Sequence, residues 1–302
     1  MIVYRELSSL EQDLGINAKI LYAVSNSINK HYRETSLPKK SGGFRYLSVP
    51  DKILKSIQRQ IAEVLLIHMP ISKYAKAYRF GSSTLRNAKH HVGKQVVLKL
   101  DILRFFDSIR YSTVKDKVFP KEIYAEPLRI LLTMLCYYKE GLPQGAPSSP
   151  PITNIILYEF DEQIGQWCRE REISYTRYCD DMAFSGDFDP AEVIRFVRVQ
   201  LKKMGFLLNE QKTRIQRLGQ QQTVTGIVVN KKLSAPADYR RKLRQELYYC
   251  RKFGIREHLQ KLGLEINEHT YRMQLLGKVN YVLQFCPDDQ ELKAAKKWLQ
   301  AK

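Results

Sequence analysis

The spacing of apolar residues predicts helices along much of the chain. Apolar residues recur at intervals of three and four within 10–34, and again from Ile53 to Leu65. The second of these segments follows Asp51, a residue suited to capping a helix, and it must end before Pro70. The same periodicity predicts three further helices, at 121–140, 151–171 and 190–204.

Two segments have the composition of strands instead. Residues 96–101 and 173–185 are rich in β-branched, aromatic and other apolar side chains, and the second predicts a hairpin with Asp180 and Asp181 near its tip. Short strands are expected to continue to about residue 230. Helices and strands in this order predict an α+β fold.

The pattern changes after Pro236, where residues 237–302 predict an all-helical module. Helices are expected at 239–254 and 269–285, and a last helix begins near Asp288 with a potential capping box. The first of these helices has a basic face interleaved with apolar and aromatic residues: Arg240, Arg241, Lys242, Leu243, Arg244, Leu247, Tyr248, Tyr249, Arg251 and Lys252.

The net charge of the chain indicates what kind of partner it binds. Among the 302 residues, 50 Lys and Arg exceed 31 Asp and Glu, which gives a net charge of +19 and indicates binding to a polyanion. Because no segment has the roughly 20 apolar residues of a membrane span, we expect nucleic acid as the partner and no membrane. The N-terminus lacks the layout of a signal peptide, so the expected location is the cytoplasm. The five cysteines have no CxxC or Cys/His spacing, which argues against disulfides and zinc.

Two adjacent carboxylates stand where the hairpin should turn. Asp180 and Asp181 interrupt strand-forming residues, and Asp101 ends the predicted strand at 96–101. An isolated Asp-Asp pair is usually a solvated turn, but three aspartates on two neighbouring strands would form a compact cluster. At a tight tip one aspartate faces the cluster and the next contributes from its edge. We therefore expect Asp101 and Asp180 to bridge metal ions and Asp181 to be the weaker ligand.

Carboxylates favour Mg²⁺, which keeps water ligands and shares its coordination sphere with substrate phosphates. Two such ions about 4 Å apart can activate an attacking hydroxyl and stabilise the leaving oxygen. We expect two Mg²⁺ ions, with Mn²⁺ as a substitute. The acid count alone does not separate a nuclease from a nucleotidyl transferase.

Three motifs occur in order along the chain: Leu100-Asp101-Ile102-Leu103-Arg104-Phe105-Phe106-Asp107, Leu142-Pro143-Gln144-Gly145-Ala146-Pro147-Ser148-Ser149-Pro150 and Tyr178-Cys179-Asp180-Asp181. Their order and separation resemble the palm motifs of reverse transcriptases. Residues 39–50 resemble the fingers segment of that family, and 209–213 resemble its lysine-bearing motif after the hairpin. The resemblance covers about 38–230.

Two shorter motifs resemble the retron branch of that family. Asn87-Ala88-Lys89-His90-His91 is similar to its Asn-Ala-x-x-His pattern, and Val224-Thr225-Gly226 to its Val-Thr-Gly pattern. The small size of the chain also resembles that group. Neither motif is specific alone, but the two flank the palm motifs.

The resemblance implies roles for residues around the aspartates. Phe106 corresponds to an aromatic gate that excludes the ribonucleotide 2′-hydroxyl, although it could also be a core residue beside Phe105. Gln144 would hydrogen-bond the nucleotide, and Gly145 would allow close approach of a backbone. Ile102, next to Asp101, is assigned to the metal and nucleotide sites.

The resemblance also implies contacts with phosphates. Arg45, with Lys39 or Lys40, would neutralise the incoming triphosphate. Lys212 would protonate or stabilise the leaving pyrophosphate, unless it forms a salt bridge to Glu210 or another acid.

Nucleic-acid contacts are expected outside the nucleotide site as well. Asn87 and His91 could contact nucleic acid or pin a loop, and their residue types do not separate these alternatives. The basic helix after Pro236 would hold a primer–template duplex and a cognate RNA through Arg240, Arg241, Arg244 and Arg251.

Taken together, the resemblance implies a right-hand polymerase. Fingers would occupy 1–95, a palm 96–230 with a fingers-like insertion near 111–143, and an all-helical thumb 231–302. The implied reaction is RNA-directed DNA synthesis from dNTPs in a bacterial retron. It copies part of a structured noncoding RNA into branched multicopy single-stranded DNA (msDNA), primed by an RNA 2′-hydroxyl, within antiphage defence with a separately encoded effector.

Two alternatives to this reading stay open. The first is another reverse transcriptase branch, either group II intron-like or diversity-generating. The second is an RNA-binding scaffold that keeps the fold without polymerising. A metal-dependent nuclease explains Phe106 and Gln144 less well.

Overall fold

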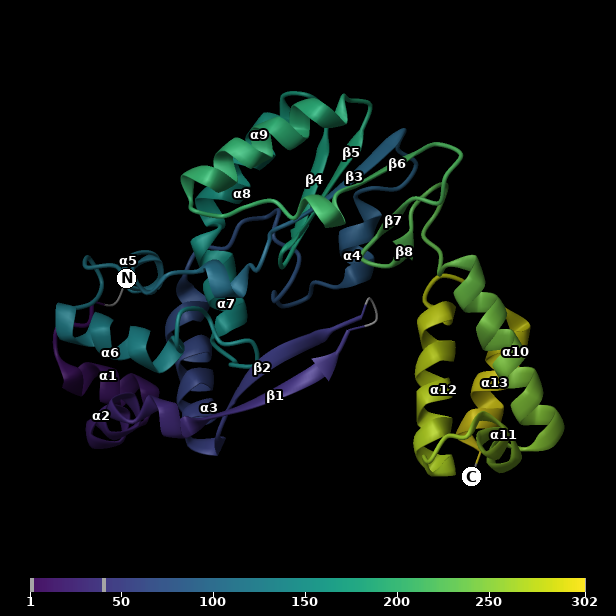
Figure 1. Cartoon of the computed structure of the whole chain (residues 1–302), viewed down its shortest axis with the longest axis horizontal. Coiled ribbons are helices and arrows are strands. Elements are labelled where there is room, and N and C mark those ends of the chain that lie inside the picture. Colours follow the sequence, from purple (N-terminus) through teal and green to yellow (C-terminus); the bar gives the residue numbers. More distant parts are fainter. Residues whose placement is uncertain (1–2, 40–41, 302) are drawn as a thin grey trace. The chain divides into compact units, whose positions relative to one another are not determined.

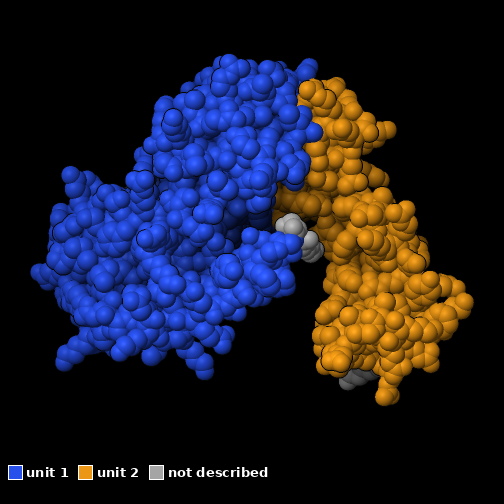
Figure 2. All heavy atoms as spheres, in the orientation of Figure 1, with its two compact units in different colours: residues 1–83, 98–215 blue, residues 84–97, 216–302 orange. Residues whose placement is uncertain are grey.

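The computed structural model describes residues 3–39 and 42–301. The chain forms two compact units, Met1–Ser83 with Leu98–Ile215, and Thr84–Val97 with Gln216–Lys302 (Figure 2). Each unit combines segments that are distant in sequence. Helices and strands occur together, which confirms the predicted α+β class (Figure 1).

The first unit begins with helices α1 (Leu7–Leu14) and α2 (Ala18–Asn26) and a short 3₁₀ turn, η1 (Ile28–His31). Helix α1 ends where Gly15 takes a left-handed conformation, with φ 62°. The prediction of helix through residue 34 was wrong from Tyr32 onward. Strand β1 (Tyr32–Pro38) pairs antiparallel with β2 (Phe44–Pro50) in a hairpin, a strand pairing that helical periodicity does not report.

Helix α3 (Lys52–Gln60) confirms the predicted cap, because the Asp51 Oδ1 accepts a hydrogen bond from the Leu54 N–H. It continues through a π-helical turn, η2 (Ile61–Leu65), and a 3₁₀ turn, η3 (Leu66–His68), and so ends before Pro70. Another 3₁₀ turn, η4 (Phe106–Ser108), precedes α5 (Tyr111–Val118).

A four-stranded sheet has the strand order β4-β5-β3-β6. Strand β3 (Val96–Asp101) coincides with its prediction, and β4 (Ser174–Tyr178) and β5 (Asp181–Gly186) form the predicted hairpin. Strand β6 (Arg214–Arg217) follows the 3₁₀ turn η5 (Glu210–Lys212). Because β3 lies next to β5, the end of β3 comes beside the hairpin tip.

Helix α8 packs on this sheet, and two of the helices in the first unit were predicted with other bounds. The helix expected at 151–171 is two helices, α7 (Ser149–Ile156) and α8 (Tyr158–Arg169), and α8 packs on β4. The one expected at 121–140 is limited to α6 (Glu126–Cys136), because Tyr138 and Gly141 pair in a turn beyond it. Helix α9 (Pro190–Lys203) packs on α8.

The second unit contains helix α4 (Thr84–Lys89), the short strands β7 (Thr223–Val224) and β8 (Ile227–Val228), and helices α10 to α13. Residues after Pro236 form an all-helical module with its own apolar core. Its helices are α10 (Ala237–Phe253), α11 (Ile255–Leu262), α12 (Glu268–Leu283) and α13 (Gln290–Gln300). The prediction missed α11, and α13 is capped by Asp289. In the described residues no helix has both the length and the apolarity that a membrane span requires.

Candidate active site

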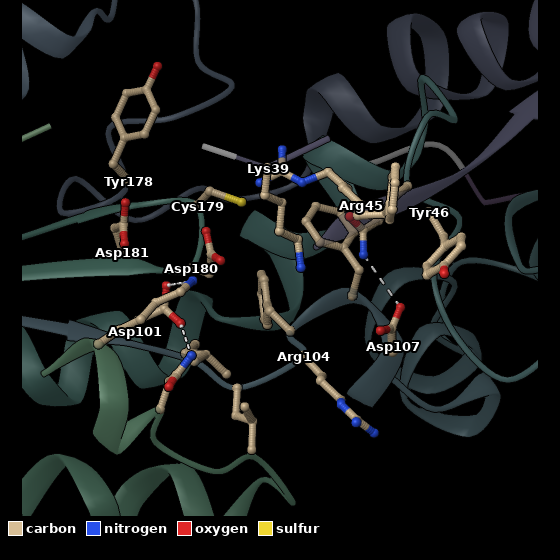
Figure 3. A pocket seen from close by; sticks show the side chains of 18 of the residues that line it. Lys39, Arg45, Tyr46, Asp101, Arg104, Asp107, Tyr178, Cys179, Asp180 and Asp181 are labelled. Carbon is tan, nitrogen blue, oxygen red and sulfur yellow. Dashed lines mark hydrogen bonds and ion pairs between the residues drawn. The ribbon is translucent and has the colours of Figure 1, made fainter. Parts of the chain in front are cut away.

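The three aspartates converge at one end of the sheet. The pairing of Tyr178 with Asp181 leaves Cys179 and Asp180 as a two-residue loop, and Cys179 takes φ 62° to close it. One carboxylate oxygen from each of Asp101, Asp180 and Asp181 lies within 4.8 Å of the others. Figure 3 shows the three carboxylates grouped beside the cavity. The predicted cluster therefore exists, whereas its binding of metal stays a prediction.

The electrostatics of the cluster suit a divalent cation. Burial, followed by repulsion from Asp101, raises the pKa of Asp180. Burial and repulsion from Asp180 and Asp101 raise the pKa of Asp181 from 3.8 to about 6. A cation between the carboxylates would relieve this repulsion, and oxygen donors are the ligands that Mg²⁺ prefers.

Two side chains bind the carboxylate oxygens of Asp101. Lys212 Nζ lies 2.8 Å from Asp101 Oδ2, and Asn209 Nδ2 donates to Asp101 Oδ1 at 3.0 Å. Partial burial opposes the charge of Lys212, but the bond to Asp101 prevails and raises its pKa. The alternative of a salt bridge from Lys212 to an acid is therefore observed, but the acid is Asp101, and Glu210 pairs with Arg198. The role of Asn209 was not predicted, although it lies in the same motif as Lys212.

A cavity of about 620 Å³ opens beside the aspartates and is lined by Phe106 and Gln144. Phe106 is half-buried, with its ring edge-on to the buried Phe105 at 5.6 Å, so it packs against the core and also forms part of the cavity wall. Gln144 Nε2 lies 3.5 Å from Asp107 Oδ1. This position is compatible with the predicted gate and nucleotide contacts.

Glycines set the shape of that wall. Gly145 has φ 131°, and a Cβ there would lie 3.0 Å from the Ser48 carbonyl oxygen, so the close backbone that Gly145 admits is that of β2. A Cβ on Gly141 would lie 2.8 Å from Asp107 Cα and 2.9 Å from the Phe106 carbonyl oxygen. Gly141 thus allows its loop to press against the backbone that carries Phe106.

Basic side chains line the same cavity. Lys39 and Arg45 come from the β1–β2 hairpin, whereas the predicted Lys40 lies outside the described residues. Arg104, which was not predicted, also lines the cavity, with its backbone at φ 46° (Figure 3). Its signal in the sequence was a cation three residues after Asp101. Three cations near three carboxylates suit a triphosphate bound with metal.

Ile102 contributes only through its main chain. Its side chain is buried, and its N–H donates to the Asp180 carbonyl at 3.3 Å. This bond links the end of β3 to the hairpin loop. An aliphatic side chain has no ligand atom, so a role in binding metal or nucleotide would have to use the backbone.

Asn87 and His91 are buried, whereas direct contact with nucleic acid would require exposed side chains. Both belong to the second unit and are 1% and 0% exposed. Their burial favours the alternative that they pin the local backbone. Helix α4 packs against β7 and β8, and the Thr225 hydroxyl donates to the Thr84 carbonyl at 3.2 Å. The Asn-Ala-x-x-His and Val-Thr-Gly motifs therefore meet in one small substructure.

The four arginines predicted on α10 have unequal surroundings. Arg244 forms ion pairs with Asp289 and Glu291, and Arg251 stacks over Trp298 at 5.7 Å. Arg240 is half-buried and Arg241 is exposed. Arg241 is thus best placed for an external phosphate, while Arg244 and Arg251 also support the helical module.

Comparisons with known proteins agree with this geometry. A family model described as "Reverse transcriptase (RNA-dependent DNA polymerase)" matches residues 37–265. The chain is 31% identical to a retron Mx65 reverse transcriptase of Myxococcus xanthus, over 98% of this chain and 72% of that protein. It is 38% identical to a retron Ec83 reverse transcriptase of Escherichia coli, over 51% of this chain and 53% of that protein.

Among solved structures, the chain is similar to telomerase from Candida albicans in complex with a TWJ fragment of telomeric RNA. The TM-score is 0.49 at 11% identity, over 89% of this chain and 63% of that chain. The family match covers most of the chain and includes the three clustered aspartates. The chain therefore belongs to the retron reverse transcriptases, which are RNA-directed DNA polymerases.

Proposed function

We propose that the chain copies part of a structured noncoding RNA into branched msDNA, using dNTPs, two Mg²⁺ ions and an RNA 2′-hydroxyl as the primer. The observation that carries this proposal is the group of three carboxylates beside a cavity with cations and Phe106 on its walls. The sequence similarity to retron reverse transcriptases supports the retron part of the proposal. Mn²⁺ is expected to substitute, since the donors are all carboxylate oxygens.

The side chains divide the work at the reacting centre. The carboxylates of Asp101, Asp180 and Asp181 would hold the metal ions, which when bound would supply activation of the attacking hydroxyl and stabilisation of the leaving oxygen. Lys39, Arg45 and Arg104 would neutralise the triphosphate, and Phe106 would lie against the sugar. Lys212 is 59% exposed while paired with Asp101, so its ammonium remains available to the leaving pyrophosphate.

The decisive experiment is to identify the nucleic acid that copurifies with the chain expressed beside its neighbouring genes. We expect a DNA that is joined to RNA through a 2′–5′ branch, and that resists ribonuclease over its DNA part. A linear cDNA without that branch would favour a group II intron-like or diversity-generating enzyme. Primer extension on heteropolymeric RNA with dNTPs and Mg²⁺ should give DNA in either case.

Two biological roles belong to the same proposal. A retron enzyme of this kind would act in antiphage defence with a separately encoded effector protein, in the bacterial cytoplasm. Phage plating on cells with the intact gene cluster, and with Asp180→Asn in the enzyme, tests that role. Equal plating on both would contradict it.

The domain assignment is also a proposal. Fingers at 1–95, a palm at 96–230 and a thumb at 231–302 do not coincide with the two compact units, because 84–97 belongs to the second unit. The helical module within 237–302 supports the thumb.

A further inference from the structure

A buried arginine lies behind the catalytic hairpin. Arg177 is on β4, two residues before Cys179, and its side chain is 0% exposed. A cation without solvent is costly, because its hydration must be replaced by fixed partners. Neighbouring buried positions of this hairpin, such as Phe184, hold apolar residues. The presence of arginine therefore calls for a specific reason.

Most of the guanidinium is occupied by one carboxylate. Arg177 Nε donates to Asp161 Oδ1 at 2.8 Å, and Arg177 Nη2 donates to Asp161 Oδ2 at 2.6 Å. Asp161 lies on α8, is itself 0% exposed, and also accepts from the Tyr175 hydroxyl at 2.8 Å. This two-pronged geometry fixes the plane of the guanidinium, which a lysine could not do.

The remaining contact reaches the catalytic loop. Arg177 Nη1 donates to the carbonyl oxygen of Cys179 at 2.9 Å. Cys179 is the left-handed residue that directly precedes Asp180. A non-glycine residue in that conformation is strained, so surrounding contacts must maintain it. The bond from Arg177 is such a contact, and an apolar side chain could not form it.

The same network holds the loop from a second side. Asn154 on α7 accepts from Arg177 Nη2 at 3.2 Å and donates to the Ala77 carbonyl at 3.0 Å. The next residue, Tyr78, donates its hydroxyl to Cys179 Sγ at 3.3 Å. Helices α7 and α8 are thus connected to both the backbone and the side chain of Cys179.

We propose that Arg177 is a positioning residue for DNA synthesis, which holds the Cys179–Asp180 loop so that Asp180 meets Asp101 and Asp181. Asp161 and Asn154 orient its guanidinium for this purpose. The inference rests on the catalytic role of the aspartates proposed above. A displacement of about 1 Å at a reacting group can cost about 100-fold in rate.

The test separates positioning from stability by removing both buried charges together. Arg177→Met alone leaves Asp161 buried without its partner, which destabilises the fold. The double variant Arg177→Met/Asp161→Asn has no unpaired charge and keeps an acceptor for the Tyr175 hydroxyl, yet it lacks the donor to Cys179. Arg177→Lys keeps the positive charge but cannot form the bidentate pair of hydrogen bonds to Asp161. All three variants are compared with the wild type by thermal melting.

The matched control is Arg129→Met. Arg129 on α6 is also buried, pairs with Asp116 at 2.6 Å and Glu126 at 2.5 Å, and donates to the Phe119 carbonyl. It makes no contact with the hairpin loop. Its loss should lower the melting temperature and leave the turnover rate of the folded enzyme unchanged.

Two measurements report whether the Cys179–Asp180 loop keeps its conformation. The first is the turnover rate and the half-saturating Mg²⁺ concentration in primer extension, measured apart from the KM for the dNTP. The second needs no activity. Cys179 is 8% exposed, and its alkylation by iodoacetamide, mapped by peptide mass, reports how often the loop opens.

We expect the double variant to melt near the wild type, to turn over about 100-fold more slowly, and to alkylate Cys179 about tenfold faster. The dNTP KM should change little. Turnover and alkylation within threefold of the wild type in this variant would overturn the proposal. Loss of fold in all three variants would also reject it, because Arg177 would then be a stability element. If the wild type itself synthesises no DNA, the proposed function fails, while the alkylation rates still test the positioning.

Discussion

The hairpin end of the sheet and the helical module both carry charge, but they use it in opposite ways. At the hairpin end a buried carboxylate is held at hydrogen-bond distance by a charged partner, as Lys212 holds Asp101. On α10 the cations lie at the surface, where Arg244 pairs with acids of its own module. Charge in low dielectric sets geometry and pKa, whereas exposed charge acts through long-range attraction. The first region should therefore determine rate and the second affinity.

The largest effect is expected for Asp180→Asn. This change keeps the size of the side chain and removes a charged ligand, so DNA synthesis should fall by at least about 1,000-fold, as a loss of several kcal/mol implies. Affinity for the cognate RNA should change by less than about threefold, because α10 is untouched. Single-turnover primer extension and filter binding measure the two quantities. Equal loss of both would erase the distinction between the regions.

Selection of the sugar should respond to the wall of the cavity. Phe106→Ala should raise ribonucleotide incorporation relative to deoxynucleotide incorporation by about tenfold or more, since the steric barrier is lost. Gly141→Ala should raise the same ratio less, because its Cβ would displace the backbone at Phe106 and Asp107. Competition assays with matched rNTP and dNTP measure the ratio. A ratio that stays constant in both variants would remove Phe106 from the gate role.

Acid should weaken metal binding at the hairpin. The pKa of Asp181 is raised to about 6, so the carboxylate is protonated below that pH and loses its attraction for the cation. We expect the half-saturating Mg²⁺ concentration to rise by up to about tenfold per pH unit below 6, and Asp181→Asn to flatten this dependence. Titrations of activity with Mg²⁺ between pH 5 and 8 provide the measurement.

The same shift has an opposite consequence for the metal-free fold. Because the folded state binds this proton more tightly than the unfolded state, the contribution of Asp181 to stability falls as pH rises from about 4 to about 6. Mg²⁺ should therefore raise the melting temperature more at pH 7.5 than at pH 5.5. An equal rise at both values would show that Asp181 does not take part in binding.

The smallest effects are expected on α10. Arg241→Gln removes an exposed cation and should weaken RNA binding by about threefold. The slope of log affinity against log salt concentration should fall by about one, because one ion fewer is released on binding. Arg244→Gln breaks ion pairs with Asp289 and Glu291, so part of its effect should be a lower melting temperature. Binding measured over a range of salt concentrations separates the two variants. A salt dependence that neither variant alters would place the RNA elsewhere.

The sequence located the aspartates correctly where their position depends on neighbours along one strand or at one turn. Asp101 at the end of β3 and the Asp180 loop were found from strand composition, because a strand and a two-residue turn are local features. The start of strand β1, residues 32–34, was mistaken for helix because apolar spacing does not report the hairpin pairing with β2. For Asn87 and His91, residue type left nucleic-acid contact and pinning of a loop as open alternatives, because it does not report burial.

By itself, the sequence determined the strands that carry the aspartates, the basic character of the chain and the helical nature of residues 237–302. Tertiary structure alone decided that Asn209 and Lys212 hold Asp101, and that Arg177 is enclosed beneath the loop it supports. The reason is physical. Composition and periodicity follow from local backbone preferences, whereas burial and hydrogen-bond partners depend on which distant segments pack together.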